Sequence, residues 1–489
     1  MKNNTLFLPG FHFATLRKKP RSASQKFADE IARIKRHSIS QLGECFGSFI
    51  PTKELDNTSK GAFSRRRLFS KTNTFWAFFS QVLDADGGCR EAIRKVQALA
   101  ASRSLKMPSS STSAYCQARA KLPKSTLRNI LDFTSEKLRN RKQSCGWKER
   151  RVIVVDGTGV SMSDTEENQQ VWPQMVSQKP GCGFPQARIC ACFCLQTGGL
   201  LSYQIGHRKN HELPLLRQQW DSFETGDIFL GDKGYCSYYD IWKFQQKGVD
   251  SVITLARRSP VEEASALKKL GKDDLLISWP KPAWNKNLSY DKTDWEALPA
   301  KLVLRQIKVT VKEPGFRVQS FYIITTLTDV DTYPANDIAD LYYQRWDVEL
   351  FFRDIKTTIG MDILRCKTPD MVEKEIHMHF IVYNSIRMLM LDAANEANVN
   401  PREISFKASI QAMRQWEPQI NRDRISDSER RRIMALLRES IADAALLIRP
   451  GRREPRAVKR RPKPFALLTA HRHEMIEIPH RNKYRAKAA

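Results

Sequence analysis

The chain has 489 residues, 41% of them hydrophobic and 27% charged, which is enough for a sizeable core spread over roughly two to four structural units. Its formal net charge of +28 favours a polyanionic partner, nucleic acid before ribosomes or anionic membranes. The ten cysteines include no Cys-x-x-Cys pair, and with no signal peptide and no apolar run of ~20 residues we expect a reduced, soluble, cytoplasmic protein without a membrane partner.

The N-terminal part of the chain divides into a basic arm and a helical region. Residues 1–70 form the arm, with one amphipathic helix expected over 27–45. Residues 71–147 are expected to be a helical DNA-binding domain. The run 108–113 suits a helix N-cap, and the helix after it carries Tyr115, Gln117, Arg119 and Lys121. Such a helix fits a DNA major groove, and it fits equally well as a solvated helix of a bundle.

Strands and helices alternate over residues 148–256, which predicts the first part of an α/β core. The expected strands cover 151–155, the hairpin 187–206, 227–230 and 251–255, and the expected helices cover 211–220 and 238–246. The first strand is expected to end at a turn, Asp156-Gly157-Thr158. Cysteines alternate along the hairpin, which indicates one face of a buried strand rather than a metal site; they are Cys190, Cys192 and Cys194.

The remaining chain is expected to leave the core and return to it. Residues 257–328 are interpreted as a β-rich insertion, and 329–445 as the second part of the core with C-terminal helices. One long helix is predicted over 335–359. Residues 446–489 form a basic tail, in which 449–463 is rich in arginine and lysine and is expected to be disordered.

Two acids occupy similar places in this core. Asp156 follows one short apolar strand and Asp232 follows another. Strand ends at one edge of an α/β sheet are where ligands gather, and Mg²⁺ prefers carboxylate and phosphate oxygens. Two neighbouring carboxylates repel each other unless a cation lies between them. Taken singly, each acid is also explained as a turn residue, because Asp-Gly and Gly-Asp are turn dipeptides.

A third acid lies on the predicted long helix. At about 100° per residue, four polar side chains fall within an arc of roughly 60°: Tyr342, Arg345, Glu349 and Lys356. One stripe therefore carries a carboxylate with an arginine, a lysine and a phenol, which suits phosphate chemistry. The alternative is an exposed face with ion pairs from Glu349 to Arg345 and to Arg353.

The same geometry places the helix's other residues away from the stripe. Asp347 and Asp354 point roughly 120–140° away from Tyr342, so they are excluded from the candidate site. We expect three residues off the stripe to anchor the helix to the protein: Tyr343, Leu350 and Ile355.

The spacing Tyr-x2-Arg-x3-Glu-x6-Lys resembles the signature of the DDE transposases of the insertion-sequence-four type, found in bacterial insertion elements. The other two motifs of that family are matched in order by Asp156-Gly157-Thr158 and by Asp232-Lys233-Gly234-Tyr235. The resemblance covers about residues 70–445. It implies an α/β fold with an RNase H-like catalytic core and a β-rich insertion.

The resemblance also implies roles for the site residues. Asp156, Asp232 and Glu349 would be catalytic and would bind two Mg²⁺ ions, with Mn²⁺ as a substitute. The DNA phosphate would be held by Tyr342, Arg345 and Lys356. Similar enzymes cut transposon ends through a hairpin intermediate and join them to target DNA. The implied partners are terminal inverted repeats, target DNA and a second copy of the chain in a homodimer.

A flipped base in such a hairpin needs an aromatic platform. Trp346, beside Arg345, is one candidate, and the insertion offers Trp279, Trp284 and Trp295, among which the sequence does not choose. Packing of the insertion is the alternative role for those three.

Two histidine pairs are not interpreted as metal ligands. His207 and His211 are explained by a loop before a helix, and His377 and His379 lie two apart on a helix and share no face.

Three other functions remain open at the level of sequence. The first is a nuclease or resolvase with the same RNase H-like core. The second is a catalytically silent DNA-binding inhibitor, and the third is a non-enzymatic basic protein that binds RNA. The large insertion and the Tyr-Arg-Glu-Lys stripe argue against the first, and the complete set of acids argues against the second.

Overall fold

The structure of the chain is a computed structural model. It describes residues 46, 49–65, 67–84, 86–102, 106–141, 146–179, 181–207, 212–256, 260–284, 291–311, 319–420, 425–446 and 474. The amphipathic helix expected over 27–45 and the basic run 449–463 lie outside the described residues.

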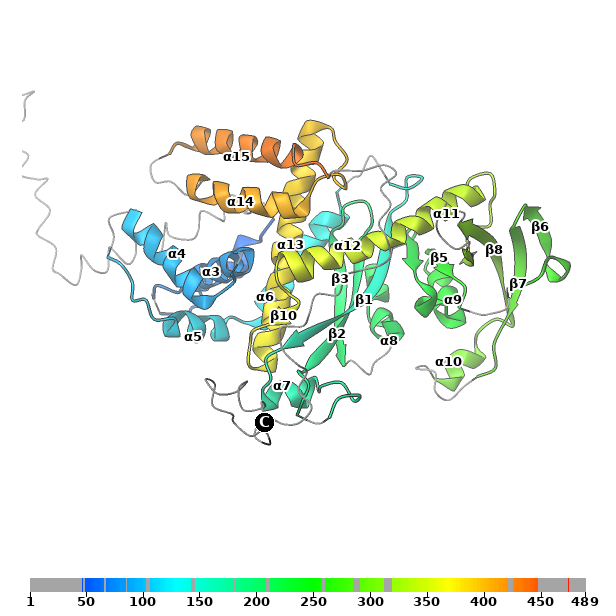
Figure 1. Ribbon diagram of the computed structural model, residues 1–489, viewed down its shortest axis with the longest axis horizontal. Coiled ribbons are helices and arrows are strands. Elements are labelled where there is room, and N and C mark those ends of the chain that lie inside the picture. The colour runs from blue at the N-terminus through cyan, green and yellow to red at the C-terminus, as the bar shows by residue number, and fades with distance from the viewer. Residues whose placement is uncertain are drawn as a thin grey trace, which may run out of the picture.

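A single mixed sheet runs through the described part of the chain (Figure 1). Its strands follow the order β3-β2-β1-β4-β5-β9-β8-β7-β6, and β10 pairs with β1 off this path. The bounds are β1 (Val152–Met162), β2 (Gln186–Cys194), β3 (Leu200–His207), β4 (Ile228–Gly231), β5 (Asp250–Thr254), β6 (Lys268–Gly271), β7 (Asp274–Pro280), β8 (Lys301–Val311), β9 (Gln319–Thr325) and β10 (Ile363–Leu364). β1 is parallel to β4 and β10, β4 is parallel to β5, and the other neighbours are antiparallel.

Helices flank the sheet on both sides. Four precede it: α3 (Lys71–Leu83), α4 (Cys89–Ser102), α5 (Ser113–Lys121) and α6 (Lys124–Arg139). Four lie between strands: α7 (Glu166–Val171), α8 (Glu212–Arg217), α9 (Tyr238–Gln246) and α10 (Lys292–Glu296). Five follow β9: α11 (Ala335–Tyr343), α12 (Asp347–Arg353), α13 (Pro369–Ala397), α14 (Phe406–Ile420) and α15 (Asp427–Ala442). None of the described helices combines the length and apolar composition needed to cross a bilayer.

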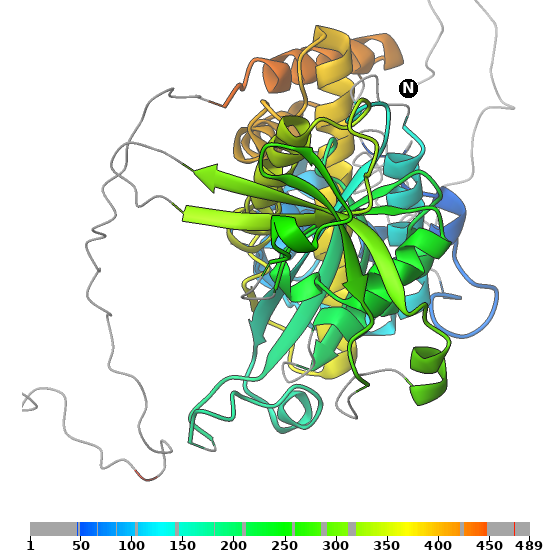
Figure 2. The same cartoon turned by 90° about the vertical axis from the view of Figure 1, so that its right-hand side faces the viewer.

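Alternate side chains of β1 face different helical layers, because successive residues of a strand point to opposite faces. Val152 and Val154 belong to one buried apolar cluster, which includes side chains of α6, α12 and α13. Ile153 and Val155 belong to a second cluster, which includes side chains of α8 and α9. The core is therefore three layers, with the sheet in the middle. Figure 2 views the molecule from the side of β6 to β8, with α13 behind the strands.

The strand order confirms the expected fold class. β3, β2 and β1 form an antiparallel unit, and β1, β4 and β5 continue it in parallel, which is the arrangement of an RNase H-like core. The hairpin predicted over 187–206 is confirmed as β2 and β3. The alternating cysteines of β2 are buried in the second apolar cluster, as expected of a strand face.

Residues 257–328 extend this sheet. β9 pairs antiparallel with β5, with Val252 opposite Thr325, and β8, β7 and β6 follow outward. Arg305 of β8 is 1% exposed, and it donates two hydrogen bonds to the Asp274 carboxylate at 2.9 and 2.6 Å. It also donates to the backbone carbonyls of Leu327 and Tyr333 at 3.2 and 2.6 Å. The buried arginine thus ties the added strands to the segment that leads into α11.

Two local predictions were wrong. The turn expected at Asp156 is part of β1, which continues to Met162 because its second half pairs with β2. The long helix expected over 335–359 is not uniform. A 3-10 turn at Gln344–Trp346 separates α11 from α12, and a π-helical segment at Asp354–Thr358 follows α12. Both segments change the rotation per residue, so the 100° rule does not hold along the whole length.

The helix expected to enter a major groove is α5, and two of its four polar residues are used inside the protein. The buried Tyr115 hydroxyl donates to Gln81 Oε1 at 2.7 Å. Arg119 donates to the same oxygen at 3.0 Å and to Cys366 Sγ at 3.7 Å. These two side chains therefore attach α5 to its neighbours and are not available to DNA bases. Gln117 and Lys121 are exposed.

Candidate active site

Asp156 and Asp232 lie at the same level of two adjacent parallel strands. Val154 of β1 is opposite Leu230 of β4, and each acid is two residues further along its strand. Both valine and leucine belong to the apolar cluster on the α12 side of the sheet. Since side chains alternate, and the backbone stays extended at both acids, both carboxylates project toward the α12 side.

Each carboxylate accepts one short hydrogen bond from its own loop or strand. Asp156 Oδ1 accepts from the Gly157 amide at 2.8 Å, and Asp232 Oδ1 accepts from the Gly234 amide at 2.7 Å. Neither acid forms an ion pair with a described residue. The turn interpretation therefore holds for Asp232, which caps a 3-10 turn, and fails for Asp156, which lies inside a strand.

The pKa of Asp156 is raised to about 6, mainly by burial and in addition by the negative charges of Glu212 and Asp232. The Gly157 amide and the Arg345 guanidinium act in the opposite direction. The protein thus brings acids together without a cation that fully compensates them. A bound divalent cation removes this repulsion, so the donor set fits a hard metal ion.

Glu212 is a site residue that the sequence analysis missed. It lies in the first turn of α8 and covers Gly157, where an added Cβ would overlap the Glu212 side chain. Its carboxylate accepts a hydrogen bond from the Tyr235 hydroxyl at 3.0 Å and pairs with Arg188 at 3.3 Å. Glu212 therefore contacts the glycine of one Asp motif and the tyrosine of the other. These are tertiary contacts, and no spacing of residues in the sequence predicts them.

Glu349 lies on α12 and is exposed. It forms no ion pair or hydrogen bond with any described residue. The alternative of a surface face held by ion pairs from Glu349 to Arg345 and Arg353 is therefore not what the structure contains. An exposed carboxylate without a partner remains available to a ligand.

Arg345 is 6% exposed, although it carries a charge. Its guanidinium lies 4.4 Å from the ring centre of Trp346 and 5.9 Å from that of Tyr342. Within the described ranges it forms no ion pair, and its buried Nε has no hydrogen-bond partner. Its charge acts on the nearby Asp156 carboxylate without forming an ion pair with it, so the guanidinium keeps hydrogen-bonding capacity for a further anion.

The two other residues of the signature already have partners. Tyr342 is buried, and its hydroxyl accepts a hydrogen bond from Thr254 at the end of β5. Lys356 is partly exposed in the π-helical segment and pairs with Asp362 at 3.2 Å. Asp362 itself is largely exposed, so Lys356 can exchange this partner for a phosphate at little cost.

Asp347 and Asp354 point away from the candidate site, as expected. Asp347 pairs with Arg402, and the buried Asp354 pairs with Arg387 at 2.8 Å. Both ion pairs attach the signature segment to the residues that follow it in the chain, so these carboxylates have structural roles.

The predicted anchors of this segment were partly wrong. Ile355 is buried as expected, but Tyr343 and Leu350 are exposed. The buried residues Val348 and Phe352 take their place. The 3-10 turn before α12 accounts for Leu350, because it rotates all later side chains relative to a uniform helix, whereas Tyr343 precedes that turn and lies on the exposed face of α11.

The tryptophans now differ in their environments. Trp279 and Trp295 are buried and pack against Tyr238, with ring centres 5.8 and 6.1 Å apart, so both have the packing role. Trp284 is 39% exposed and Trp346 is 55% exposed. Only these two of the four candidates can meet a base without rearrangement.

In the part of the chain that the structure describes, no three His, Cys, Asp or Glu side chains lie close enough to hold a metal ion as they stand. His377 and His379 are buried in α13, and burial lowers the pKa of His379 to about 3. His211 lies outside the described residues. Asp156 in β1 and Asp232 directly after β4 lie close together, and Glu349 on α12 is the third acid on the same side of the sheet.

Comparison with known proteins identifies relatives. The family model described as "Transposase DDE domain" matches residues 147–385. The chain is 25% identical over 436 residues to the transposase InsG for insertion sequence element IS4 of Escherichia coli (strain K12), covering 87% of this chain and 93% of that protein. It is 35% identical over 83 residues to a probable transposase for IS5377 of Geobacillus stearothermophilus, covering 17% of this chain and 22% of that one. A cryo-EM structure of a piggyBac transposase synaptic complex with hairpin DNA superposes with a TM-score of 0.39 at 12% identity, over 86% of this chain and 84% of that one.

The raised pKa of Asp156 predicts that Asp156→Asn stabilises the metal-free protein. The pKa of this carboxyl is 3.8 in its ordinary state and about 6 in the folded chain, so ionisation favours unfolding as pH rises through 6. We expect the variant to gain about 1–3 kcal/mol in free energy of unfolding at pH 8, and the gain to vanish near pH 4. Urea denaturation in EDTA at pH 8, 6 and 4 measures this. A less stable variant at pH 8 contradicts it.

The fit of Glu212 over Gly157 predicts a coupled pair of substitutions. Gly157→Ala displaces a flexible side chain rather than backbone, so we expect the melting temperature to change little. Divalent-ion affinity should fall about 10–100-fold, as for other residues that orient metal ligands. Because the clash requires Glu212, the double variant with Glu212→Ala should bind metal no more weakly than Glu212→Ala alone. Calorimetric titration with Mn²⁺ provides the four affinities, and simple additivity of the two losses would contradict the coupling.

Proposed function

We propose that this chain binds the terminal inverted repeats of its element and cuts and joins DNA at Asp156, Asp232 and Glu349. The chain belongs to the DDE transposases of insertion sequences, which are enzymes of DNA phosphoryl transfer that use divalent metal. The proposed reaction is cut-and-paste transposition through a hairpin intermediate. The proposed partners are the terminal repeats, target DNA and a second copy of the chain.

The observation that carries this proposal is the uncompensated charge on one side of the sheet. Among the described residues, neither the two carboxylates nor the exposed Glu349 forms an ion pair, and the buried Arg345, whose charge acts on Asp156, forms none either. A DNA phosphate with bound metal ions neutralises both at once. An inhibitor that only binds DNA has no need for the acids, and a basic RNA-binding protein has no need for a buried arginine next to them.

Each residue of the signature has its own proposed role at the DNA phosphate. Arg345 presents a planar guanidinium that binds a phosphate bidentately, and Lys356 supplies a second positive charge. Tyr342, whose hydroxyl accepts from Thr254, donates its own proton to a phosphate oxygen. The three acids would hold two Mg²⁺ ions, or Mn²⁺ in their place, and the chemistry supplied there would be activation of the attacking oxygen and stabilisation of the leaving one.

Trp346 is proposed to support a base displaced when the hairpin forms. One face of its ring carries the Arg345 guanidinium, so stacking of a base on the ring would be coupled to the phosphate held by Arg345. Trp284 is the remaining candidate from residues 257–328.

The first prediction from this function concerns Glu349. We expect Glu349→Gln to lower the rate of Mg²⁺-dependent cleavage of the terminal repeats by at least about 10³-fold, because an amide binds a divalent cation poorly. Repeat binding, measured by mobility shift, should change less than about twofold. Asp347→Asn on the same helix is the matched control, since its ion pair with Arg402 lies away from the site.

Two outcomes count against the proposal. Unchanged cleavage in Glu349→Gln removes this residue from the metal site. Cleavage of unrelated DNA at the same rate, without strand transfer, assigns the chain to the nucleases with the same core.

The second prediction concerns Arg345. If Arg345 binds a phosphate and does not stabilise the fold, the melting temperature of Arg345→Met should equal or exceed that of the wild type, because an unpaired buried charge is removed. Cleavage should fall by about 10²-fold or more, and Arg345→Lys should restore it only in part, since lysine lacks the bidentate geometry. Differential scanning fluorimetry and the cleavage assay are compared. A large loss of melting temperature in Arg345→Met shows instead that this arginine holds the fold.

A further inference from the structure

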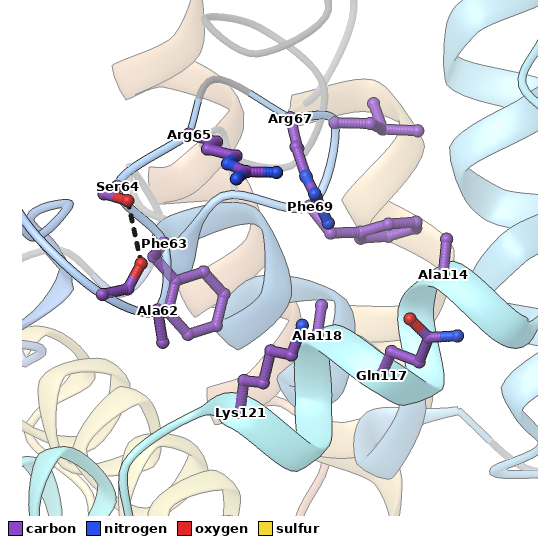
Figure 3. A pocket seen from close by; sticks show the side chains of 12 residues that line it. Ala62, Phe63, Ser64, Arg65, Arg67, Phe69, Ala114, Gln117, Ala118 and Lys121 are labelled. Carbon is purple, nitrogen blue, oxygen red and sulfur yellow. Dashed lines mark hydrogen bonds between the residues drawn. The ribbon is translucent and has the colours of Figure 1, made fainter.

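A cavity lies far along the chain from the acids, between residues 61–69 and α5. Its volume is about 690 Å³, within the range of sites that hold small molecules. Figure 3 shows Arg65 and Arg67 on the wall formed by the loop, and Gln117 and Lys121 rising from α5 opposite them. Phe63 and Phe69 supply aromatic surface to the same cavity.

The charge of the cavity is of one sign. Arg65, Arg67 and Lys121 are exposed, and the described residues that line the cavity include no acid. None of the three cations forms an ion pair with a described residue. Three unpaired cations around one recess repel each other and favour an anionic ligand.

The aromatic wall is held in a costly conformation. Phe63 has φ +66°, the left-handed region that a side chain with a Cβ rarely adopts. The Ser64 hydroxyl donates to the Gly61 carbonyl at 2.8 Å within the same turn. Strained residues of this kind gather at ligand sites, because the surrounding structure is arranged to present one side chain. Here the strain presents a half-buried ring beside the cations.

A second cavity of about 310 Å³ adjoins the first and shares Phe69 and Gln117 with it. The hydroxyls of Ser109, Ser111 and Ser113 line this extension, and hydroxyls are common donors to phosphate oxygens. The two cavities share lining residues and so form one path, and their combined volume exceeds that of one nucleotide, which suits a strand better than a free nucleotide.

We propose that this path binds an unpaired strand of DNA, with phosphates at Arg65, Arg67 and Lys121 and one base against Phe63. A duplex presents phosphates and base edges but keeps its base faces stacked, so it cannot use a recessed ring. The Gln117 amide faces the same recess and can hydrogen-bond a base edge. The inference rests on the proposed function only for the choice of DNA, and it does not depend on the three acids.

The test uses the full chain carrying Glu349→Gln, in EDTA, so that neither metal nor cleavage contributes. Fluorescence anisotropy measures the binding of a 12-nucleotide thymidine oligomer and of a 12-base-pair duplex. We expect Phe63→Leu to weaken binding of the single strand at least about fivefold and that of the duplex less than twofold. Arg65→Ala/Arg67→Ala should weaken single-strand binding about tenfold and reduce its salt dependence.

Lys53→Ala/Lys137→Ala is the matched control, because it removes two exposed cations outside both cavities. It should leave single-strand affinity within about twofold. Gln117→Ala/Lys121→Ala, at exposed positions of α5, tests the same site if Phe63→Leu folds poorly, and should weaken single-strand binding about fivefold.

Free thymidine monophosphate and inorganic phosphate serve as competitors. We expect half of the bound oligomer to be displaced only when the concentration of the monophosphate is at least about a hundredfold higher than that of the oligomer. The reason is that the monophosphate occupies only a fraction of the path. Equal affinity for the free nucleotide, or equal losses for single strand and duplex in Phe63→Leu, would overturn the proposal. A failure of cleavage in the wild-type chain concerns the proposed function and leaves this result unaffected.

Discussion

The repulsion between acids at the ends of β1 and β4 is the constraint around which the site is built. Parallel pairing fixes Val154 opposite Leu230, and two residues later it fixes Asp156 near Asp232. Glu212 adds a third negative charge from α8, while Arg345 lies buried nearby without an anion. The separated charges cost folding free energy in the absence of ligands, and the same charges are those that we propose to bind a metal ion and a phosphate.

The rest of the structure offsets this cost. Both faces of β1 are covered by apolar clusters, so the strand that carries Asp156 is fixed from two sides. Outside the site, the buried arginines Arg305 and Arg387 each face a carboxylate, in contrast to Arg345. Buried charges that form ion pairs hold segments of the chain together, whereas a buried charge without an ion pair is a candidate site for a ligand.

Much of the fold could be predicted because its signals are local. The hairpin of β2 and β3, the helix α9 and the buried cysteine face follow from periodicity and turn residues. Asp156 was expected in a turn because Asp-Gly is a turn dipeptide, yet pairing with β2 carries β1 through it. Tertiary pairing, which overrides local preference, cannot be read from spacing.

The signature helix shows a second limit. A constant 100° per residue separated Glu349 from Asp347 and Asp354, and in the structure both aspartates form ion pairs whereas Glu349 forms none with a described residue. It misplaced Leu350, because a 3-10 turn interrupts the helix before that residue, and it misplaced Tyr343, because a position off the stripe does not by itself imply burial. Glu212 was not predicted as part of the candidate site, because its contacts with Gly157 and Tyr235 form only in the folded chain.

The pairing of β9 with β5 has a consequence for how such a core can gain or lose parts. Without β9, β5 would be an edge strand with a free row of backbone donors and acceptors, ready to pair with another molecule. The strands between residues 257 and 328 therefore protect the core from self-association, whatever else they do. A shortened chain without these strands would expose the edge of β5 unless another segment covered it. Deletion of residues 257–328 would therefore lower solubility as well as change activity.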